Sequence, residues 1–250
     1  MIEFFVIILG LVIGSFLNAV IYRLHVGVSF MKGHSYCPFC KHNLDFRDLF
    51  PVFSFIFLKG KCRYCRKKIS WQYPLVELAT AMAFLLLYFK FGLSATFAVY
   101  LIYTVFLIII FVFDWRYYLV LDKVSIPAVV IAFLLSFFVL KISLLSLLLG
   151  LLIGGGFFLL QYLVSRGKWI GGGDIRLGLM MGAMLGYQAL LVALFIAYFT
   201  GSLGGLGLIF SGRKKWKSQV PFGTFLSLAT FAAFLIGSAV ILFYKNLLIL

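Results

Sequence analysis

The chain has 250 residues, of which 64% are hydrophobic and only 12% are charged, whereas a soluble domain is about half apolar and about a quarter charged. This composition excludes an ordinary soluble domain and an intrinsically disordered chain. The chain carries 22 Lys and Arg residues against 7 Asp and Glu, and in a membrane protein such an excess reports first on which loops face the cytoplasm.

Uncharged stretches of about 20 residues predict membrane-spanning helices along most of the chain. The first helix is expected at 2–22, and it is predicted to stay in the membrane because no basic segment precedes it, unlike a cleaved signal peptide. The stretch 177–210 is uncharged and too long for one span, so a turn at Gly186-Tyr187-Gln188 is expected to divide it. Further helices are predicted at 74–91, 94–113, 124–140, 142–165 and 220–244. The sequence therefore predicts an all-α polytopic membrane protein of about eight transmembrane helices.

The distribution of basic residues agrees with this layout. The loops hold 19 of the 22 Lys and Arg residues, and in an eight-helix chain with its N-terminus outside, all of these loops fall on one side. The four loops are 23–73, 114–123, 166–176 and 211–219. The remaining Lys90, Lys141 and Lys245 fall on the other side. The basic excess is thus explained by topology in a lipid bilayer, with the four loops cytoplasmic, and no nucleic-acid partner is expected.

All four cysteines lie in the polar insert 23–73, as Cys37-Pro-Phe-Cys40 and Cys62-Arg-Tyr-Cys65. Two C-x-x-C turns at this separation can bring four thiolates to one tetrahedral metal, and zinc is the usual ion. The alternatives are two disulfides or unligated thiols, and disulfides are rare on the reducing cytoplasmic side. His34 and His42 lie near the first turn but are expected on the surface, because four thiols already close a structural site. An insert of about 50 residues is expected to need the metal to fold.

The acidic residues of the membrane region are few enough to consider singly. Asp114 follows the apolar run 107–113, and Asp174 follows Gly171-Gly172-Gly173. Both are predicted at the cytoplasmic membrane boundary, where a carboxylate is a candidate functional group. Alternatively, Asp174 caps a helix and Asp114 extends into the headgroups. If the two share a site, one can hold a proton while the other activates water, as in aspartic proteases.

Several segments together resemble the prepilin peptidases, or type IV leader peptidases, the GxGD class of membrane aspartyl protease. The segments 14–24 and 69–78 resemble the end of that family's first helix and the start of its second. The two cysteine turns resemble its knuckles, Gly171-Gly172-Gly173-Asp174 fits GxGD, and Val220-Pro221-Phe222-Gly223 resembles its late motif. These matches span nearly the whole chain in the family's order.

The resemblance implies an enzyme of the bacterial inner or cytoplasmic membrane that cuts the basic leader from prepilins or pseudopilins after a glycine, on the cytoplasmic side. It implies that Asp174 is one catalytic aspartate, with Gly171 and Gly173 forming its loop. Asp114 is implied as the other, from a segment 114–122 in which Arg116 and Leu121 replace the family's Asp and Pro. Asp122 survives there, and it is the alternative to Asp114.

Many members of that family also methylate the new N-terminus with S-adenosylmethionine, and Gly60, Lys61 and Glu77 are candidates for that site. Glu77 has an alternative role as a carboxylate favoured by the helix dipole. The expected division is a first helix (1–22), a zinc-binding insert with a possible methyltransferase part (23–73) and a peptidase core (74–250). The rival functions are a transporter, which should carry midplane carboxylates and repeated halves, and a scaffold that only binds pilin subunits.

Overall fold

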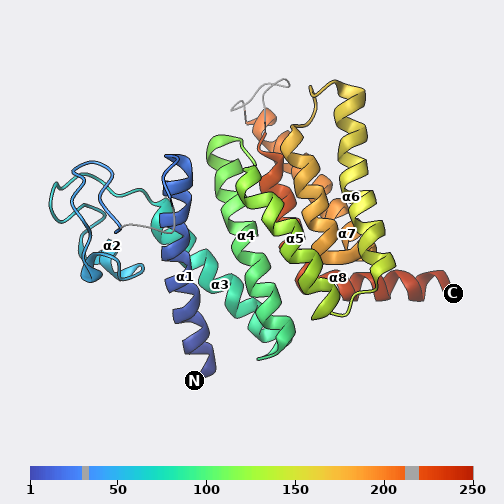
Figure 1. The fold of residues 1–250 in the computed structure, drawn as a ribbon, viewed down its shortest axis with the longest axis horizontal. Helices are drawn as coiled ribbons and strands as arrows, with labels where there is room; N and C mark the ends of the chain where they lie inside the picture. The colour runs from blue at the N-terminus through green and yellow to red at the C-terminus, as the bar shows by residue number, and fades with distance from the viewer. Residues whose placement is uncertain (30–33, 212–219, 250) are drawn as a thin grey trace. The chain divides into compact units, whose positions relative to one another are not determined.

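A computed structural model describes residues 1–29, 34–211 and 220–249, and this part of the chain is helical, without a strand (Figure 1). The elements are α1 (Ile2–His25), the 3-10 helix η1 (Phe46–Asp48), α2 (Phe53–Phe57), α3 (Gln72–Phe91), α4 (Ala95–Tyr117), α5 (Asp122–Phe138), α6 (Leu144–Ser165), α7 (Gly172–Phe210) and α8 (Phe222–Ile249). The predicted all-α class is confirmed. Of the four basic loops, residues 212–219 and part of the insert, 30–33, lie outside the described residues.

Six of the described helices are long and apolar enough to cross a membrane, namely α1, α3, α4, α6, α7 and α8. The remaining long helix, α5, has 17 residues. Within α7, Gly186 has a φ of 66° and a ψ of 174°, which are not helical values. The interruption falls in the predicted turn and divides α7 into two segments. Together, α5 and this division account for the difference between six apolar spans and eight predicted helices.

The chain divides by its contacts into two units, Met1–Leu93 and Ser94–Leu250. In the first unit, α1 packs closely against α3 because Gly10 and Gly14 allow the two backbones to approach. A Cβ atom at Gly14 would lie only 2.7 Å from the Cα atom of Glu77. Small residues spaced by four are a common means of packing helices in membranes, where burial of apolar side chains gives little advantage.

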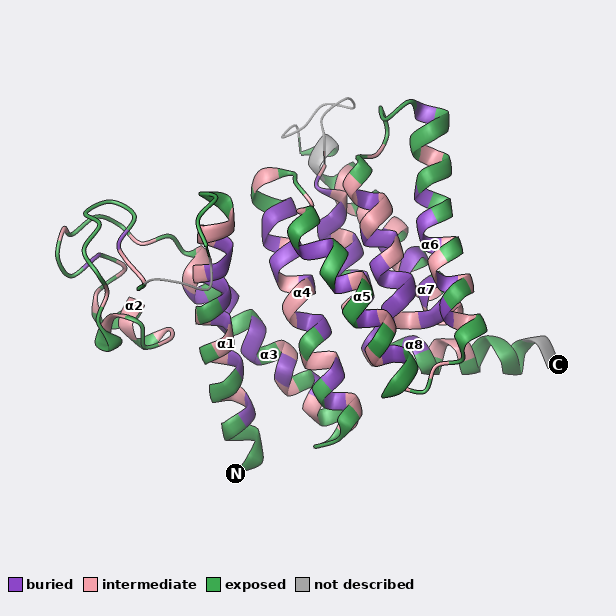
Figure 2. Cartoon of the chain, viewed as in Figure 1, coloured by how far each residue is buried: buried purple, intermediate pink, exposed green. Residues whose placement is uncertain are grey.

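In the second unit, the same device joins α6 to α7. Gly150 and Gly154 of α6 face Gly182 and Gly178 of α7, and a Cβ atom at Gly150 would lie 2.6 Å from the carbonyl oxygen of Gly182. Buried residues line the inner faces of this unit, whereas the outer face of α6 is exposed (Figure 2). Its exposed leucines, such as Leu152 at 70% exposure, form the kind of apolar surface that contacts lipid.

The end of α4 differs from the expectation in a way that matters for the site. The apolar run ends at Phe113, yet α4 continues to Tyr117 and Asp114 lies in its last turn. The helix continues because its backbone hydrogen bonds do not depend on apolar side chains, and Tyr118 donates its N–H to the carbonyl oxygen of Asp114 at 3.0 Å. Tyr118 then ends the helix with a φ of 55°.

Candidate functional site

Asp114 is held between the end of α4 and the start of α8. Its side chain is buried, at 7% exposure, and its Oδ2 atom accepts the backbone N–H of Thr224 at 2.7 Å. Thr224 lies in the first turn of α8, where backbone N–H groups have no partner within the helix. A carboxylate is favoured at such a position, because the positive end of the helix dipole faces it. Gly223 permits this contact, since a Cβ atom there would lie 3.0 Å from the Asp114 carboxylate.

Asp174 lies in the first turn of α7 and is 9% exposed. Its Oδ2 atom accepts the N–H of Gly171 at 3.0 Å, and its own N–H donates to the carbonyl oxygen of Gly171 at 3.1 Å. Position 173 has room only for a glycine, because a Cβ atom there would lie 2.7 Å from the Cβ atom of Val120. Val120 lies in the segment that joins α4 to α5. The glycine segment thus lets the α4–α5 connection approach α7 beside Asp174.

The structure brings Asp114 and Asp174 together within the second unit, close enough for a Coulombic interaction between the two carboxylates. Asp122 has a different environment. Its side chain is 54% exposed and forms an ion pair with Arg176 of α7. Of the three acidic residues in this unit, two are therefore buried and interact with each other, and the third pairs with a cation near the surface.

A glutamine and a tyrosine that sequence reasoning missed bind each other in the same unit as Asp174. Gln161 of α6 and Tyr198 of α7 form two hydrogen bonds, in which the amide nitrogen donates to the hydroxyl at 2.8 Å and the hydroxyl donates to the amide oxygen at 3.1 Å. The Tyr198 hydroxyl is close enough to Asp174 to interact with it electrostatically, and its ring packs on Phe222 at 5.0 Å between centroids. The sequence signal that could have found them is a polar side chain inside an apolar helix.

The glycines of α7 that follow Asp174 do not line an open groove. Gly178 and Gly182 do not leave room for a further helix, because α6 fills that space through Gly154 and Gly150. This face of α7 is therefore occupied by α6.

The four cysteines of the insert converge. Their Sγ atoms all lie within 4.8 Å of one another, and those of Cys37 and Cys65 are 3.8 Å apart. The two turns are built alike: the N–H of Cys37 donates to the carbonyl oxygen of His42 and the N–H of Cys62 to that of Lys67, each at 2.9 Å. This arrangement can hold one metal ion, which would require that no disulfide forms among these thiols.

The protonation of these thiols also favours a cation. Burial opposes ionisation of Cys37, but the backbone N–H groups of Cys40 and Phe39 hold its pKa at about 7, below the usual thiol value. For Cys65 the backbone N–H of Lys67 favours the thiolate, yet burial and the other three cysteines raise its pKa to about 11. Four thiolates held this close repel one another, and a bound cation relieves that repulsion.

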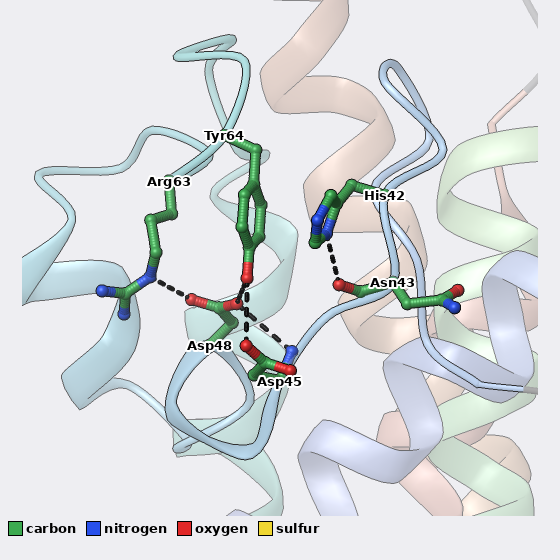
Figure 3. A network of polar contacts seen from close by, with 6 residues as sticks. All are labelled: His42, Asn43, Asp45, Asp48, Arg63 and Tyr64. Carbon is green, nitrogen blue, oxygen red and sulfur yellow. Dashed lines mark hydrogen bonds and ion pairs between the residues drawn. The ribbon is translucent and has the colours of Figure 1, made fainter.

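Polar contacts join the second cysteine turn to Asp45 and Asp48, in the segment that follows the first (Figure 3). The Tyr64 ring stacks on His42 at 3.6 Å between centroids, and its hydroxyl donates to Asp45 at 3.2 Å and to Asp48 at 3.1 Å. Arg63 donates to Asp48 at 2.7 Å. Asp48 is thus a structural acceptor, with a side chain only 4% exposed. His42 lies outside the group of four converging sulfur atoms.

Glu77 links α3 to the insert. Its side chain is buried, at 6% exposure, and its Oε2 atom accepts the backbone N–H of Val52 at 2.7 Å. Nearby, Asn18 of α1 donates to the carbonyl oxygen of Tyr73 at 3.0 Å. Gly60 has a φ of 66°, and Lys61 is exposed. Among the described contacts, Glu77 is joined to Val52 rather than to Gly60 or Lys61.

Comparison with known proteins gives consistent matches over both units. Residues 8–91 match the bacterial peptidase A24 N-terminal domain, and residues 101–206 match the type IV leader peptidase family. The chain is 33% identical over 243 residues to a prepilin leader peptidase/N-methyltransferase of Bacillus subtilis (strain 168), covering 95% of each chain. It is 30% identical over 268 residues to the protein of that name from Dichelobacter nodosus, covering 95% of this chain and 92% of the relative. No solved structure matches.

Proposed function

The chain belongs to the type IV leader peptidase family, and on that premise we propose that it removes the basic leader of type IV prepilins or pseudopilins by cutting after a glycine. As a member of this family it is an aspartic peptidase. The observation that carries the proposal is the burial of Asp114 and Asp174 in one unit, close enough to interact. These residues lie within the predicted core 74–250 and within Ser94–Leu250.

In the proposed reaction, Asp114 is the base and Asp174 the acid. Two carboxylates in one site share a single proton, and we assign that proton to Asp174. Asp114 removes a proton from water as the water oxygen bonds to the scissile carbonyl carbon, and Asp174 gives its proton to the carbonyl oxygen. The diol then collapses: one of its hydroxyls returns a proton to Asp174 as the C=O bond re-forms, the C–N bond breaks, and the amine leaves with the proton that Asp114 took.

We prefer Asp114 to Asp122 as the first aspartate. Asp122 is exposed and already paired with Arg176, so its charge is used in holding the start of α5 to α7. Gly171 and Gly173 form the loop that orients Asp174, with the Gly171 N–H bound to its carboxylate.

Tyr198 and Gln161 are proposed to bind the peptide backbone of the substrate near the cleavage point. A phenol and an amide offer both donors and acceptors, as an extended peptide requires, and both side chains are only partly buried. They can exchange their mutual hydrogen bonds for bonds to the substrate without leaving a buried group unpaired.

Zinc is the metal that we propose for the insert. Tetrahedral zinc with four thiolates at about 2.3 Å separates the sulfur atoms by roughly 3.8 Å, and the Cys37–Cys65 distance has that value. Such a closed site has no open position, so its role is to hold Cys37, Cys40, Cys62 and Cys65, and with them the insert, in one conformation.

We propose that the chain also methylates the N-terminus that cleavage exposes, because its relatives are named prepilin leader peptidase/N-methyltransferase. S-adenosylmethionine would supply the methyl group. Gly60, Lys61 and the buried Glu77 are proposed to form the site, in the insert and the adjoining start of α3.

The chain is proposed to lie in the bacterial inner membrane with the insert and the aspartates at its cytoplasmic face. The apolar helices support a multi-pass membrane protein, and the basic loops support this orientation.

Mass spectrometry of a purified prepilin after incubation with the purified protein tests the proposed function. We expect a mass loss equal to the leader, followed by a gain of about 14 Da only when S-adenosylmethionine is added, the mass of one CH₂ unit. An unchanged prepilin that nevertheless co-purifies with the protein would indicate a scaffold instead.

A further inference from the structure

A run of ten residues in the insert, 49–58, contains no charged side chain and only one polar one, Ser54. It includes four of the chain's phenylalanines and forms the short helix α2. Phe53 is 50% exposed, Ile56 61% and Phe57 81%. An apolar run of this length is too short to span a membrane but suits a segment that lies at its surface. Contiguous exposed apolar residues of this kind mark an interaction site.

Two contacts fix the position of this segment along the helices of its own unit. The N–H of Val52 is bound to Glu77, and Glu77 packs against Gly14 of α1. Gly14 precedes the last residue of α1, His25, by about three turns, roughly 16 Å along the helix. The Phe55 ring also packs against Trp71, at 4.9 Å between centroids, just before α3 begins. The segment therefore lies beside the spans, inside their ends, and next to a tryptophan of the kind that marks membrane interfaces.

A groove on the segment combines apolar and basic groups. Its volume is about 330 Å³, and its lining includes Phe50, Phe53 and Phe57 together with Arg47 and Arg63. Between residues 34 and 71 the chain has eight Lys and Arg residues against two Asp. Guanidinium groups bind phosphate well, and basic side chains beside an apolar surface favour anionic lipid.

We propose that residues 49–58 form a membrane anchor that enters the lipid leaflet at the C-terminal end of α1, and that its groove seats an anionic phospholipid. The aromatic side chains contact the acyl chains, and Arg47 contacts the phosphate, whereas Arg63 stays paired with Asp48. Because Asp48 binds both Arg63 and Tyr64, the anchor also holds the cysteine turns against the membrane surface.

Photocrosslinking in nanodiscs tests this proposal with the full chain. Phospholipids carrying a diazirine near the top of the acyl chain are irradiated, and the labelled peptides are identified by mass spectrometry. We expect labelling of residues 49–58 as well as of α1 and α3, and no labelling of residues 35–43 in the first cysteine turn. Labelling of α1 and α3 without labelling of 49–58, or crosslinks from 49–58 to a second copy of the chain, would overturn the proposal.

Two variants separate the anchor from a general effect on the insert. Arg47→Gln is expected to lower the preference of 49–58 for phosphatidylglycerol over phosphatidylcholine by about fivefold, the typical effect of one basic side chain at a membrane surface. Phe57→Ser should lower labelling by both lipids. Phe39→Ser, which alters an exposed aromatic residue of the first cysteine turn, is the matched control and should change neither. The metal content of each variant reports whether its insert is folded. An unchanged lipid preference in a metal-loaded Arg47→Gln protein would overturn the phosphate contact.

Discussion

Among the described residues, the two buried aspartates are held by backbone N–H groups and not by ion pairs. Asp114 accepts a backbone N–H from the start of α8, and Asp174 accepts one from the segment that precedes α7. Backbone donors satisfy a carboxylate without cancelling its charge, whereas the ion pair of Asp122 with Arg176 does cancel it. The two buried aspartates are therefore the ones that we propose for chemistry on a peptide.

Tyr198 is the residue whose removal should affect substrate binding more than chemistry. Tyr198→Phe keeps the ring on Phe222 and removes one hydroxyl, so we expect KM for a prepilin peptide to rise about fivefold with kcat little changed, as for loss of ~1 kcal/mol of binding. Steady-state cleavage kinetics give both constants.

Tyr103→Phe is the matched control for that prediction. Tyr103 is fully buried in the same unit, and its hydroxyl bonds to Ala132 at 2.9 Å and Ser136 at 2.8 Å. Its loss should lower thermal stability and leave KM unchanged. Equal kinetic effects from the two variants would mean that Tyr198 acts through the fold alone.

At the scale of elements, neighbouring glycines of the GxGD segment should differ sharply. Gly173→Ala places a Cβ atom where Val120 already lies, whereas a Cβ atom at Gly172 meets nothing within 4 Å. We expect Gly173→Ala to destabilise the protein by about 1–3 kcal/mol, the usual cost of overpacking, and to lower cleavage. Thermal unfolding in detergent and the cleavage assay should show no comparable change for Gly172→Ala.

The insert should depend on its metal more than the helices do. The purified protein is expected to hold about one zinc ion per chain, as a four-thiolate site does, and Cys62→Ser should lower that content because it removes a buried ligand. Elemental analysis and limited proteolysis of the insert measure the two effects. A metal-free wild-type protein whose four thiols are all alkylated freely would contradict the zinc assignment.

At the scale of the whole molecule, the sequence predicted the helices, the cysteine cluster and the family. Hydropathy located the long helices and the turn at Gly186, because lipid imposes length and polarity directly on a span. The spacing of the cysteines likewise predicted their convergence. Motif resemblance identified the family and drew attention to Asp114 and Asp174.

The rest depended on tertiary contacts. Sequence did not show that α6 fills the space beside Gly178 and Gly182, that Gln161 meets Tyr198, or that Val52 is bound to Glu77. The Gln161–Tyr198 and Val52–Glu77 contacts join residues that are 37 and 25 positions apart. The packing of α6 on α7 depends on a register that their glycines set. The pattern of side chains along one helix does not specify its neighbour.

Cleavage of a prepilin by three variants tests the central claim most directly. Asp114→Asn and Asp174→Asn should each reduce the cleavage rate by several orders of magnitude. Two residues that act as one catalytic unit both become ineffective when either is removed. Asp122→Asn should retain cleavage within about tenfold, because only a surface ion pair is lost. Leader release is measured by mass spectrometry on protein whose unfolding temperature matches the wild type. Normal cleavage by Asp114→Asn, together with inactive Asp122→Asn, would contradict this account and assign the first catalytic position to Asp122.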